Sequence, residues 1–412
     1  MAAQETNSLQ FELLDKYMSC PNDSHRAWWQ KTGPLLARLM SSAGYSNQSQ
    51  CQYLIFFYTS IVPFLGPYPQ KFPSAMTHNE LPLELSINYQ QLGGATPVVR
   101  VAVEPITSIS GTKEDPYNVS PIRDFLDRLE KIDPEGYDSR LFEHFYPKHT
   151  LSEIECQNLQ AKNETIRELS QVSFGFDLKP DAISVKGYTF PGLKCHATEG
   201  DLCSVVIGSV QEYLGDADRY KTLDMIQEYI ETTDSRFNFG FVYSHDCVIP
   251  EKSRHKLYGR TKDMSWSKVE EVWNMGGRVD SPESNKGLDY LQRLWKLLRI
   301  GNGPHPLGLH LVWNYETKAG LKVPATKIYF PVYGLNDQDN VRAIAQYLTQ
   351  IGLQAHGDAY ERTVQDYFPG FDIKHTDRLI CWVSFAYTEK TGVYLSVYYH
   401  SSLEYHPGLS LV

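Results

Sequence analysis

Lysine, arginine and tyrosine side chains recur at alternating positions along several β-rich runs of the sequence. Lys186 and Tyr188 are two residues apart, as are Lys256 and Tyr258. Side chains two residues apart on a strand share one face, so these groups are predicted to point in a common direction. The complete set comprises Arg100, Lys186, Tyr188, Arg254, Lys256, Tyr258, Lys327, Tyr329, Tyr394 and Tyr398.

These side-chain types together suit a multiply charged anion. Arginine offers forked donors, lysine a point charge and tyrosine a neutral donor, and all three can coordinate phosphoryl oxygens. Several inward cations without matching carboxylates would repel one another in a low-dielectric interior. The pattern therefore predicts a diphosphate as the normal occupant of the site.

Other common phosphate-binding motifs are missing from the sequence. There is no Walker sequence and no DDxxD cluster, which would hold phosphate through a glycine-rich loop or through Mg²⁺. The stretch Gly301-Asn302-Gly303-Pro304-His305-Pro306 has prolines where a helix should open, which disfavours a dinucleotide site. We therefore expect no cofactor and no catalytic metal.

The interleaved tyrosines allow two interpretations. Their ring faces attract cations by ~0.5–2 kcal/mol each, so beside a diphosphate they can shield an allylic carbocation from water. Alternatively, each tyrosine forms a cross-strand packing pair. The sequence leaves both interpretations open.

Glu84 is the single carboxylate on the same face of the first predicted strand. One interpretation pairs it with Arg100 on the adjacent strand. The other makes it the acceptor of a hydrogen bond from an aromatic N–H, which would raise the nucleophilicity of the ring and fix its orientation. Glu84 is therefore the candidate catalytic residue.

The strands that carry these side chains are predicted to form five antiparallel hairpins, separated by turn residues such as Gly93-Gly94. Lys186, Lys256 and Lys327 recur at intervals of about 70 residues, which indicates an internal repeat. The paired runs are Leu83–Tyr89 with Val98–Glu104, Ser173–Asp177 with Ile183–Phe190, Phe237–Ser244 with Arg254–Arg260, Leu309–Tyr315 with Thr326–Tyr333, and Leu379–Thr388 with Val393–His400.

Segments with helical periodicity lie between the hairpins; Leu288, Leu291, Trp295 and Leu298, for example, share one face. If such helices cover the apolar strand faces, the cationic faces belong either to an open, solvated sheet or to the lumen of a closed barrel. Repetition of the pattern on four or five strands favours the barrel. We predict an α+β fold in which a ten-stranded antiparallel β-barrel, built from five αββα repeats, is surrounded by a ring of α-helices. It should form a single domain over residues 1–412, with residues 1–22 as a loosely ordered arm.

The composition excludes several classes of partner. The 412 residues include 39 Lys and Arg against 49 Asp and Glu, a formal net charge of −10. Nucleic acids and anionic membranes both require a basic surface, so neither is expected to bind. The N-terminus lacks the basic start and apolar run of a signal peptide, and the seven dispersed cysteines include no CxxC pair. We expect a cytoplasmic monomer or homodimer with reduced thiols and small-molecule partners.

The sequence resembles the fungal aromatic prenyltransferases of the dimethylallyltryptophan synthase family from about residue 25 to residue 400. The segments that carry the resemblance are His25-Arg26-Ala27-Trp28-Trp29, Ala43-Gly44-Tyr45, Phe64-Leu65-Gly66-Pro67, Pro82-Leu83-Glu84-Leu85-Ser86-Ile87-Asn88, Val99-Arg100-Val101, Val185-Lys186-Gly187-Tyr188, Arg254-His255-Lys256-Leu257-Tyr258, Lys327-Ile328-Tyr329 and Tyr394-Leu395-Ser396-Val397-Tyr398.

The resemblance implies the barrel fold and transfer of a dimethylallyl group from dimethylallyl diphosphate to an indole carbon or nitrogen. The implied reaction is an electrophilic aromatic substitution without a catalytic metal. Glu84 would contact the indole nitrogen, and the cationic and phenolic set would bind the diphosphate. Lys327 stands where some members of the family have a neutral amide.

One departure from the family pattern bears on the acceptor. Members that alkylate C4 of free tryptophan place a lysine on the first strand of the second hairpin, whereas here that strand reads Ser173-Phe174-Gly175-Phe176-Asp177. A tryptophan-containing cyclic dipeptide is therefore the favoured acceptor. The alternatives are free tryptophan, tyrosine or another phenol as acceptor, or a non-catalytic barrel carrier of an anionic or aromatic metabolite.

Overall fold

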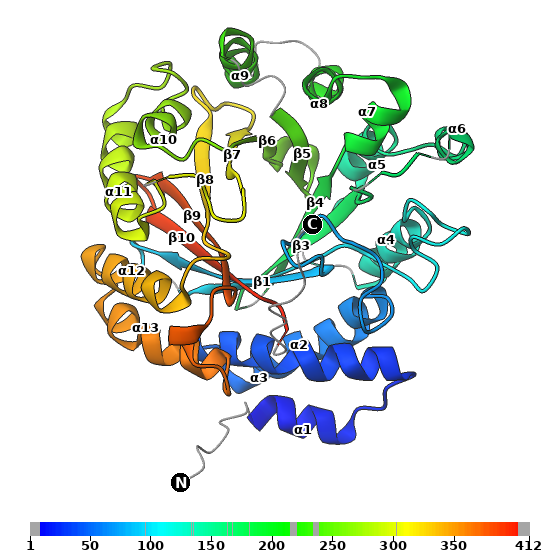
Figure 1. Ribbon diagram of the computed structural model, residues 1–412, viewed down its shortest axis with the longest axis horizontal. Coiled ribbons are helices and arrows are strands. Elements are labelled where there is room, and N and C mark those ends of the chain that lie inside the picture. The colour runs from blue at the N-terminus through cyan, green and yellow to red at the C-terminus, as the bar shows by residue number, and fades with distance from the viewer. Residues whose placement is uncertain are drawn as a thin grey trace.

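A closed β-barrel occupies the centre of the computed structural model, and helices form a ring around it (Figure 1). The structure describes residues 9–402 except 95, 133, 135, 163, 167, 181, 215–220, 234–238 and 302. Around the barrel the strand order is β1-β10-β9-β8-β7-β6-β5-β4-β3-β2, and every neighbouring pair whose register is given is antiparallel. The predicted barrel is confirmed, and its closure excludes the open sheet.

All ten predicted strands are present, with bounds that differ by at most two residues from the expected ones; the predicted start of the fifth, Phe237, lies outside the described residues. The strands are β1 (Leu83–Gln90), β2 (Val98–Val103), β3 (Val172–Leu178), β4 (Ile183–Thr189), β5 (Phe239–Asp246), β6 (His255–Thr261), β7 (Leu311–Thr317), β8 (Ala325–Pro331), β9 (Ile380–Thr388) and β10 (Gly392–Tyr399).

Helices fill the segments between the hairpins and cover the outside of the barrel (Figure 1). They are α1 (Leu9–Tyr17), α2 (Asp23–Ser42), α3 (Asn47–Phe56), α4 (Ser120–Ile132), α5 (Arg140–His149), α6 (Glu153–Lys162), α7 (Gly192–Thr198), α8 (Leu202–Leu214), α9 (Lys221–Thr232), α10 (Trp266–Trp273), α11 (Pro282–Leu298), α12 (Asp337–Gln350) and α13 (Gln354–Tyr367), with short helical turns η1 (Phe57–Ile61), η2 (Val62–Phe64), η5 (Pro250–Lys252) and η6 (Ile373–His375).

Helix α11 shows how the sequence defines these elements. Ser281 caps its N-terminus by accepting a hydrogen bond from the Ser284 backbone N–H at 3.1 Å, and Pro282 occupies the first turn, where its missing N–H is harmless. Leu291 and Leu298, both on the predicted apolar face, are buried against the barrel. The helical period thus places the apolar face of α11 against the barrel strands.

Strand alternation separates the core from the lumen. On β1, Leu83, Leu85 and Ile87 are at most 1% exposed and belong to the core between barrel and helices. Glu84 and Ser86, on the opposite face, line a cavity inside the barrel. Apolar packing therefore stabilises the outside of the barrel wall and leaves the inside free to carry polar chemistry.

The N-terminal segment is partly helical. Within the expected loose arm, residues 9–17 form α1, whose Phe11 packs on the Trp29 ring with centroids 4.8 Å apart. The Trp29 indole N–H donates to Asp15 Oδ1 at 2.9 Å. Residues 1–8 of the arm lie outside the described part of the chain.

Two further expectations concern the whole chain. The structure pairs none of the seven cysteines, all of which lie within the described residues. None of the described helices has both the length and the apolar character needed to cross a membrane.

Candidate active site

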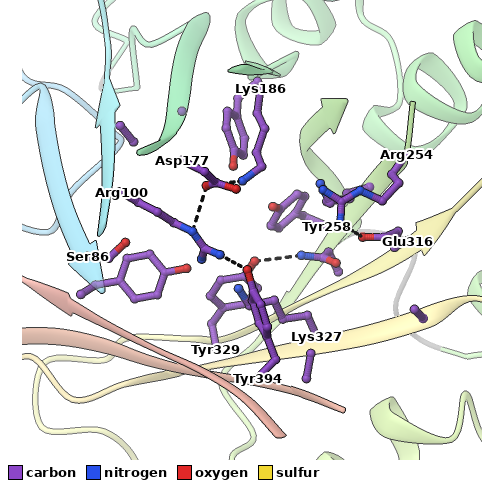
Figure 2. Close-up of a pocket in the computed structure, with 18 of the residues that line it drawn as sticks. Ser86, Arg100, Asp177, Lys186, Arg254, Tyr258, Glu316, Lys327, Tyr329 and Tyr394 are labelled. Carbon is purple, nitrogen blue, oxygen red and sulfur yellow. Dashed lines mark hydrogen bonds and ion pairs between the residues drawn. The ribbon is translucent and has the colours of Figure 1, made fainter. Parts of the chain in front are cut away.

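Glu84 and the ten predicted cationic and phenolic residues all line one cavity of about 290 Å³ inside the barrel. They come from β1, β2, β4, β6, β8 and β10, and Arg254 lies directly before β6. Figure 2 shows the labelled members of the set converging on a common space. The structure therefore brings together every predicted site residue.

The cavity also contains carboxylates. Asp177 Oδ1 lies 2.9 Å from Arg100 Nε and 2.6 Å from Lys186 Nζ (Figure 2). The expectation that the inward cations lack matching carboxylates was therefore wrong. The reason is alternation on β3, which puts Ser173, Gly175 and Asp177 on the lumen face. Burial raises the pKa of Asp177, but the charges of Lys186 and Arg100 outweigh burial and hold it below its usual range.

A second group of ion pairs lies across the cavity. Arg254 Nε is 2.5 Å from Asp246 Oδ2, and its Nη1 is 3.4 Å from Glu316 Oε2. Lys256 Nζ is 3.4 Å from Asp246 Oδ1. The strand register aligns Lys186 with Asp246 and Lys256 with Glu316, so opposite charges face each other across neighbouring strands.

Of the five basic side chains that line this cavity, Lys327 is the one for which the described residues supply no ion-pair partner. Its Nζ lies 4.9 Å from the centre of the Tyr329 ring and 5.4 Å from that of Tyr394. Burial and the neighbouring cations lower the pKa of Lys327 well below its usual value, and burial also lowers that of Lys186 to about 8. Five basic side chains thus meet four carboxylates, Asp177, Asp246, Glu316 and Glu84, and burial disfavours the charged form of Glu84, a balance that favours an incoming anion.

Four tyrosines form a wall through the middle of the lumen, which we call the tyrosine wall: Tyr188, Tyr258, Tyr329 and Tyr398. The Tyr329 ring centre lies 6.1 Å from that of Tyr258 and 6.2 Å from that of Tyr398. Asn314 Nδ2 donates to the Tyr329 hydroxyl at 2.9 Å. Tyr329 thus connects the rings of Tyr258 and Tyr398, and all four tyrosines line the cavity.

Glycine at position 175 makes room for this wall. A Cβ at Gly175 would lie 3.1 Å from the Tyr188 ring, tighter than ordinary van der Waals contact. A side chain at this position on β3 would therefore displace Tyr188.

A second cavity, also of about 290 Å³, lies on the other side of the tyrosine wall. It shares Glu84, Ala102 and all four wall tyrosines with the first cavity. The rest of its lining is largely apolar and includes Met76, Phe190, Leu193, Leu202, Phe241, Val242 and Trp382. We call the two spaces the cationic cavity and the apolar cavity.

The sequence reasoning did not find the apolar cavity. Met76 lies in the segment before β1, and Leu193 and Leu202 lie in α7 and at the start of α8, outside the strand pattern. Two signals were available: Phe190, two residues beyond Tyr188 on the lumen face, and Trp382, which lies opposite Tyr398 on a predicted strand.

Glu84 lines both cavities. It lies opposite Ala102, whereas Arg100 lies opposite Ser86 and pairs with Asp177. The described residues therefore do not form the ion pair between Glu84 and Arg100 that the sequence left open. Burial raises the pKa of Glu84 to about 8, against the opposing effect of the Lys327 charge.

Three acidic side chains of the lumen pair with basic side chains, and the described residues do not group them as metal ligands. The described part of the chain gathers no group of three or more His, Cys, Asp or Glu side chains that could hold a metal ion. Asp177, Asp246 and Glu316 instead face arginine and lysine. Arginine, lysine and tyrosine are thus the groups available to a bound diphosphate.

An antiparallel barrel ringed by helices, with a cationic cavity beside an apolar cavity, is the arrangement of an aromatic prenyltransferase. Comparison with known proteins gives the family: the sequence profile of tryptophan dimethylallyltransferase matches residues 24–363. The chain belongs to this family and is an indole prenyltransferase. This assignment favours an enzyme over the non-catalytic carrier.

Similar proteins cover nearly the whole chain. Prenyltransferase phqI of Penicillium fellutanum is 43% identical over 94% of this chain and 91% of its own length. The crystal structure of NotF in complex with brevianamide F and DMSPP has a TM-score of 0.89 and 36% identity, covering 97% of this chain and 100% of NotF. AnaPT from Neosartorya fischeri has a TM-score of 0.86 and 30% identity, covering 96% of this chain and 98% of AnaPT.

Proposed function

We propose that this chain transfers a dimethylallyl group from dimethylallyl diphosphate to the indole ring of a tryptophan-containing cyclic dipeptide. The observation that carries the proposal is the meeting of two cavities across the tyrosine wall. The cationic cavity suits a diphosphate, and the apolar cavity suits an aromatic acceptor. Glu84 lines both, where donor and acceptor would meet.

The first chemical step is ionisation of the donor. The bond between the allyl carbon and the diphosphate oxygen breaks, and its electron pair leaves with the diphosphate. Preorganised cations stabilise this developing negative charge. The residues that we assign to this task are Arg100, Lys186, Arg254, Lys256 and Lys327, with Tyr394 as a neutral donor.

The tyrosine wall then protects the allylic cation. Ring faces stabilise a nearby positive charge and keep water away from it. An indole atom supplies the electron pair for the new bond, and transfer of the proton from that atom to the released diphosphate restores the aromatic ring. Glu84 accepts the hydrogen bond of the indole N–H, which makes the ring more nucleophilic and fixes its position.

The lining of the apolar cavity includes a hydrogen-bond donor that favours an acceptor substrate with carbonyl oxygens. The Arg260 guanidinium stacks on the Phe241 ring, 4.8 Å from its centre, and makes no ion pair with the described residues. Its free N–H groups can therefore donate to the amide carbonyls of a cyclic dipeptide. Ser173, rather than a lysine, lines this cavity. Binding of brevianamide F by NotF supports the same class of acceptor.

The reaction should not require a metal, because Arg and Lys side chains supply the positive charge that Mg²⁺ would otherwise provide. The protein is also proposed to work in the cytoplasm, which cell fractionation would test.

A product assay tests the proposal directly. The protein is incubated with dimethylallyl diphosphate and, separately, brevianamide F, tryptophan or tyrosine in the presence of EDTA. Mass spectrometry should show one added C5H8 unit on brevianamide F in preference to the amino acids, and NMR should place it on the indole. No gain with any acceptor contradicts the function, a preference for tryptophan or tyrosine contradicts the acceptor, and activity only without EDTA contradicts metal independence.

A further inference from the structure

Glu104 is a fully buried carboxylate just beyond the end of β2, and it lines neither cavity. Ser170 Oγ donates to its Oε2 at 2.6 Å, and Ser74 Oγ donates to the same oxygen. Asn118 Nδ2 donates to Oε1 at 3.3 Å. Within the described ranges no Lys, Arg or His forms an ion pair with Glu104, so neutral donors alone hold this acid.

This arrangement is costly for the fold. Burial raises the pKa of Glu104 to about 7, although its three hydrogen bonds oppose the change. A buried carboxylate without a cation contributes less to stability than apolar packing of similar size. Stability alone therefore does not account for an acid at this position, and its contacts indicate what else it does.

The hydrogen bonds of Glu104 join segments that form one wall of the apolar cavity. Ser74 belongs to the segment between η2 and β1, residues 66–82, which we call the strap. The Ala75 backbone N–H donates to Ser170 Oγ at 2.8 Å, and the Met76 N–H donates to Ser74 Oγ at 3.2 Å. Ala75, Met76 and Ser170 all line the apolar cavity. One carboxylate thus connects two lining segments.

The strap also packs against a residue that lines the apolar cavity. The ring of His78 packs on Trp382 of β9, with centroids 4.7 Å apart, and Trp382 lines the apolar cavity. A shift of the strap would therefore move both Met76 and the support of Trp382. The apolar cavity would change shape while the cationic cavity, which none of these residues lines, would not.

We propose that Glu104 is a positioning residue that fixes the strap as a wall of the apolar cavity and thereby sets both the affinity for the acceptor and the ring atom that meets the allyl cation. This inference rests on the proposed function, because it assumes that the apolar cavity binds the acceptor. Glu104 touches neither substrate and acts through Ser74 and Ser170.

Two variants and one control test the inference. Glu104→Gln keeps the shape but replaces an acceptor oxygen with an N–H₂ group. Ser74→Ala leaves Glu104 in place and removes the hydroxyl that bonds to it from the strap, together with the acceptor of the Met76 N–H. Ser209→Ala is the control, since the buried Ser209 hydroxyl bonds with the His149 ring at 2.7 Å on the outside of the barrel. It also removes a buried hydroxyl hydrogen bond, but away from both cavities.

Each variant is assayed with dimethylallyl diphosphate and brevianamide F, and the positional isomers of the product are quantified. Glu104→Gln should raise KM for brevianamide F about 10-fold and Ser74→Ala several-fold, as expected for loss of a hydrogen bond to a charged group. Both should change the isomer ratio and leave KM for the diphosphate within about twofold, and Ser209→Ala should change none of these values.

The outcomes separate the two proposals. An active wild type whose KM values and isomer ratio are unchanged in both variants overturns the role of Glu104 alone, even if their thermal stability falls. An equal rise in both KM values, or the same kinetic change in Ser209→Ala, also overturns it and indicates a purely structural role. A wild type that adds no C5H8 unit overturns the proposed function and this inference with it.

Discussion

The ammonium group of Lys327 lies 4.9 Å from the centre of the Tyr329 ring, and both side chains belong to β8. The attraction of the tyrosine ring offsets only part of the free energy that a buried lysine loses when it leaves water. A bound diphosphate would offset the rest. Lys327 is therefore the lumen residue whose behaviour should depend most on the donor.

Replacing Lys327 with glutamine, a neutral amide of similar length, tests this dependence. We expect KM for dimethylallyl diphosphate to rise about 10-fold or more, because a charge-assisted contact is lost. The melting temperature of the empty protein should rise, because the substitution removes a buried cation to which the described residues supply no carboxylate partner. Steady-state kinetics and thermal unfolding measure the two effects. Unchanged donor affinity would show that Lys327 does not contact the diphosphate.

Donor binding should also take up protons. Burial lowers the pKa of Lys186 to about 8 and that of Lys327 well below its usual value, so part of this charge is missing from the empty cavity near pH 8. An anion favours the charged forms and raises both pKa values. Titration calorimetry at pH 8 with a thio-analogue of the donor, in buffers of different ionisation enthalpy, should detect proton uptake that shrinks in Lys327→Gln. Proton release on binding would contradict this picture.

Glu84→Gln should separate activity from stability. Turnover should fall ~10²-fold or more while donor affinity changes little, because only the acceptor loses its partner. The pKa of Glu84 is raised from 4.5 to about 8 in the folded protein, so its ionisation opposes folding increasingly as pH rises through this window. Glu84→Gln should therefore melt at a higher temperature than the wild type at pH 9 but not at pH 4. Equal turnover in the two proteins would remove Glu84 from the mechanism.

The activity of the wild type should depend on the same ionisation. If the ionised carboxylate is the better acceptor for the indole N–H, kcat/KM for brevianamide F should rise with pH toward a plateau above about pH 8. The residual activity of Glu84→Gln should lack this rise. A pH profile that is identical in the two proteins would assign the titration to another group.

Asp177→Asn should make the thermal stability of the protein depend more strongly on bound diphosphate. The substitution leaves Arg100 and Lys186 close together without their shared carboxylate, at a cost of ~3–5 kcal/mol. Inorganic diphosphate can replace part of the missing charge, so it should raise the melting temperature of the variant more than that of the wild type. Thermal unfolding with and without diphosphate measures this difference, and equal shifts would contradict it.

Buried histidines between the outer face of the barrel and its helices should make the protein sensitive to acid. Burial lowers the pKa of His149 and His245 to about 3 and that of His255 to about 4. The unfolded chain binds these protons from about pH 6.5 downward, so stability is lost as pH falls from 6.5 toward 4. Neither ring nitrogen of His245 has a hydrogen-bond partner in the described part of the protein. His245→Leu should lose less stability than the wild type between pH 7 and pH 5 in urea unfolding, and equal losses would contradict this.

Strand alternation predicted the parts of the site that follow a local period. All ten strands and the lumen orientation of residues such as Lys186 and Tyr258 could be found from the sequence, because each strand repeats every two residues. Partners from different hairpins could not. Lys186 faces Asp246 only because β4 lies beside β5, and the local pattern of either strand does not predict that register.

The apolar cavity escaped prediction for a related reason. Met76 lies in the irregular strap, and Leu193 and Leu202 lie in the segment between β4 and β5, so their convergence depends on tertiary packing. Glu104 was recognised as a strand end, but its burial depends on Ser74, Asn118 and Ser170, which come from three separate segments.

A crystal structure with the thio-analogue of the donor and brevianamide F together would test the two-cavity arrangement most directly. We predict that the diphosphate lies in the cationic cavity within hydrogen-bond distance of Arg100 and Lys327. The indole should occupy the apolar cavity with its nitrogen about 3 Å from a carboxylate oxygen of Glu84. An indole bound away from Glu84, or a diphosphate outside the cationic cavity, would contradict the proposed mechanism.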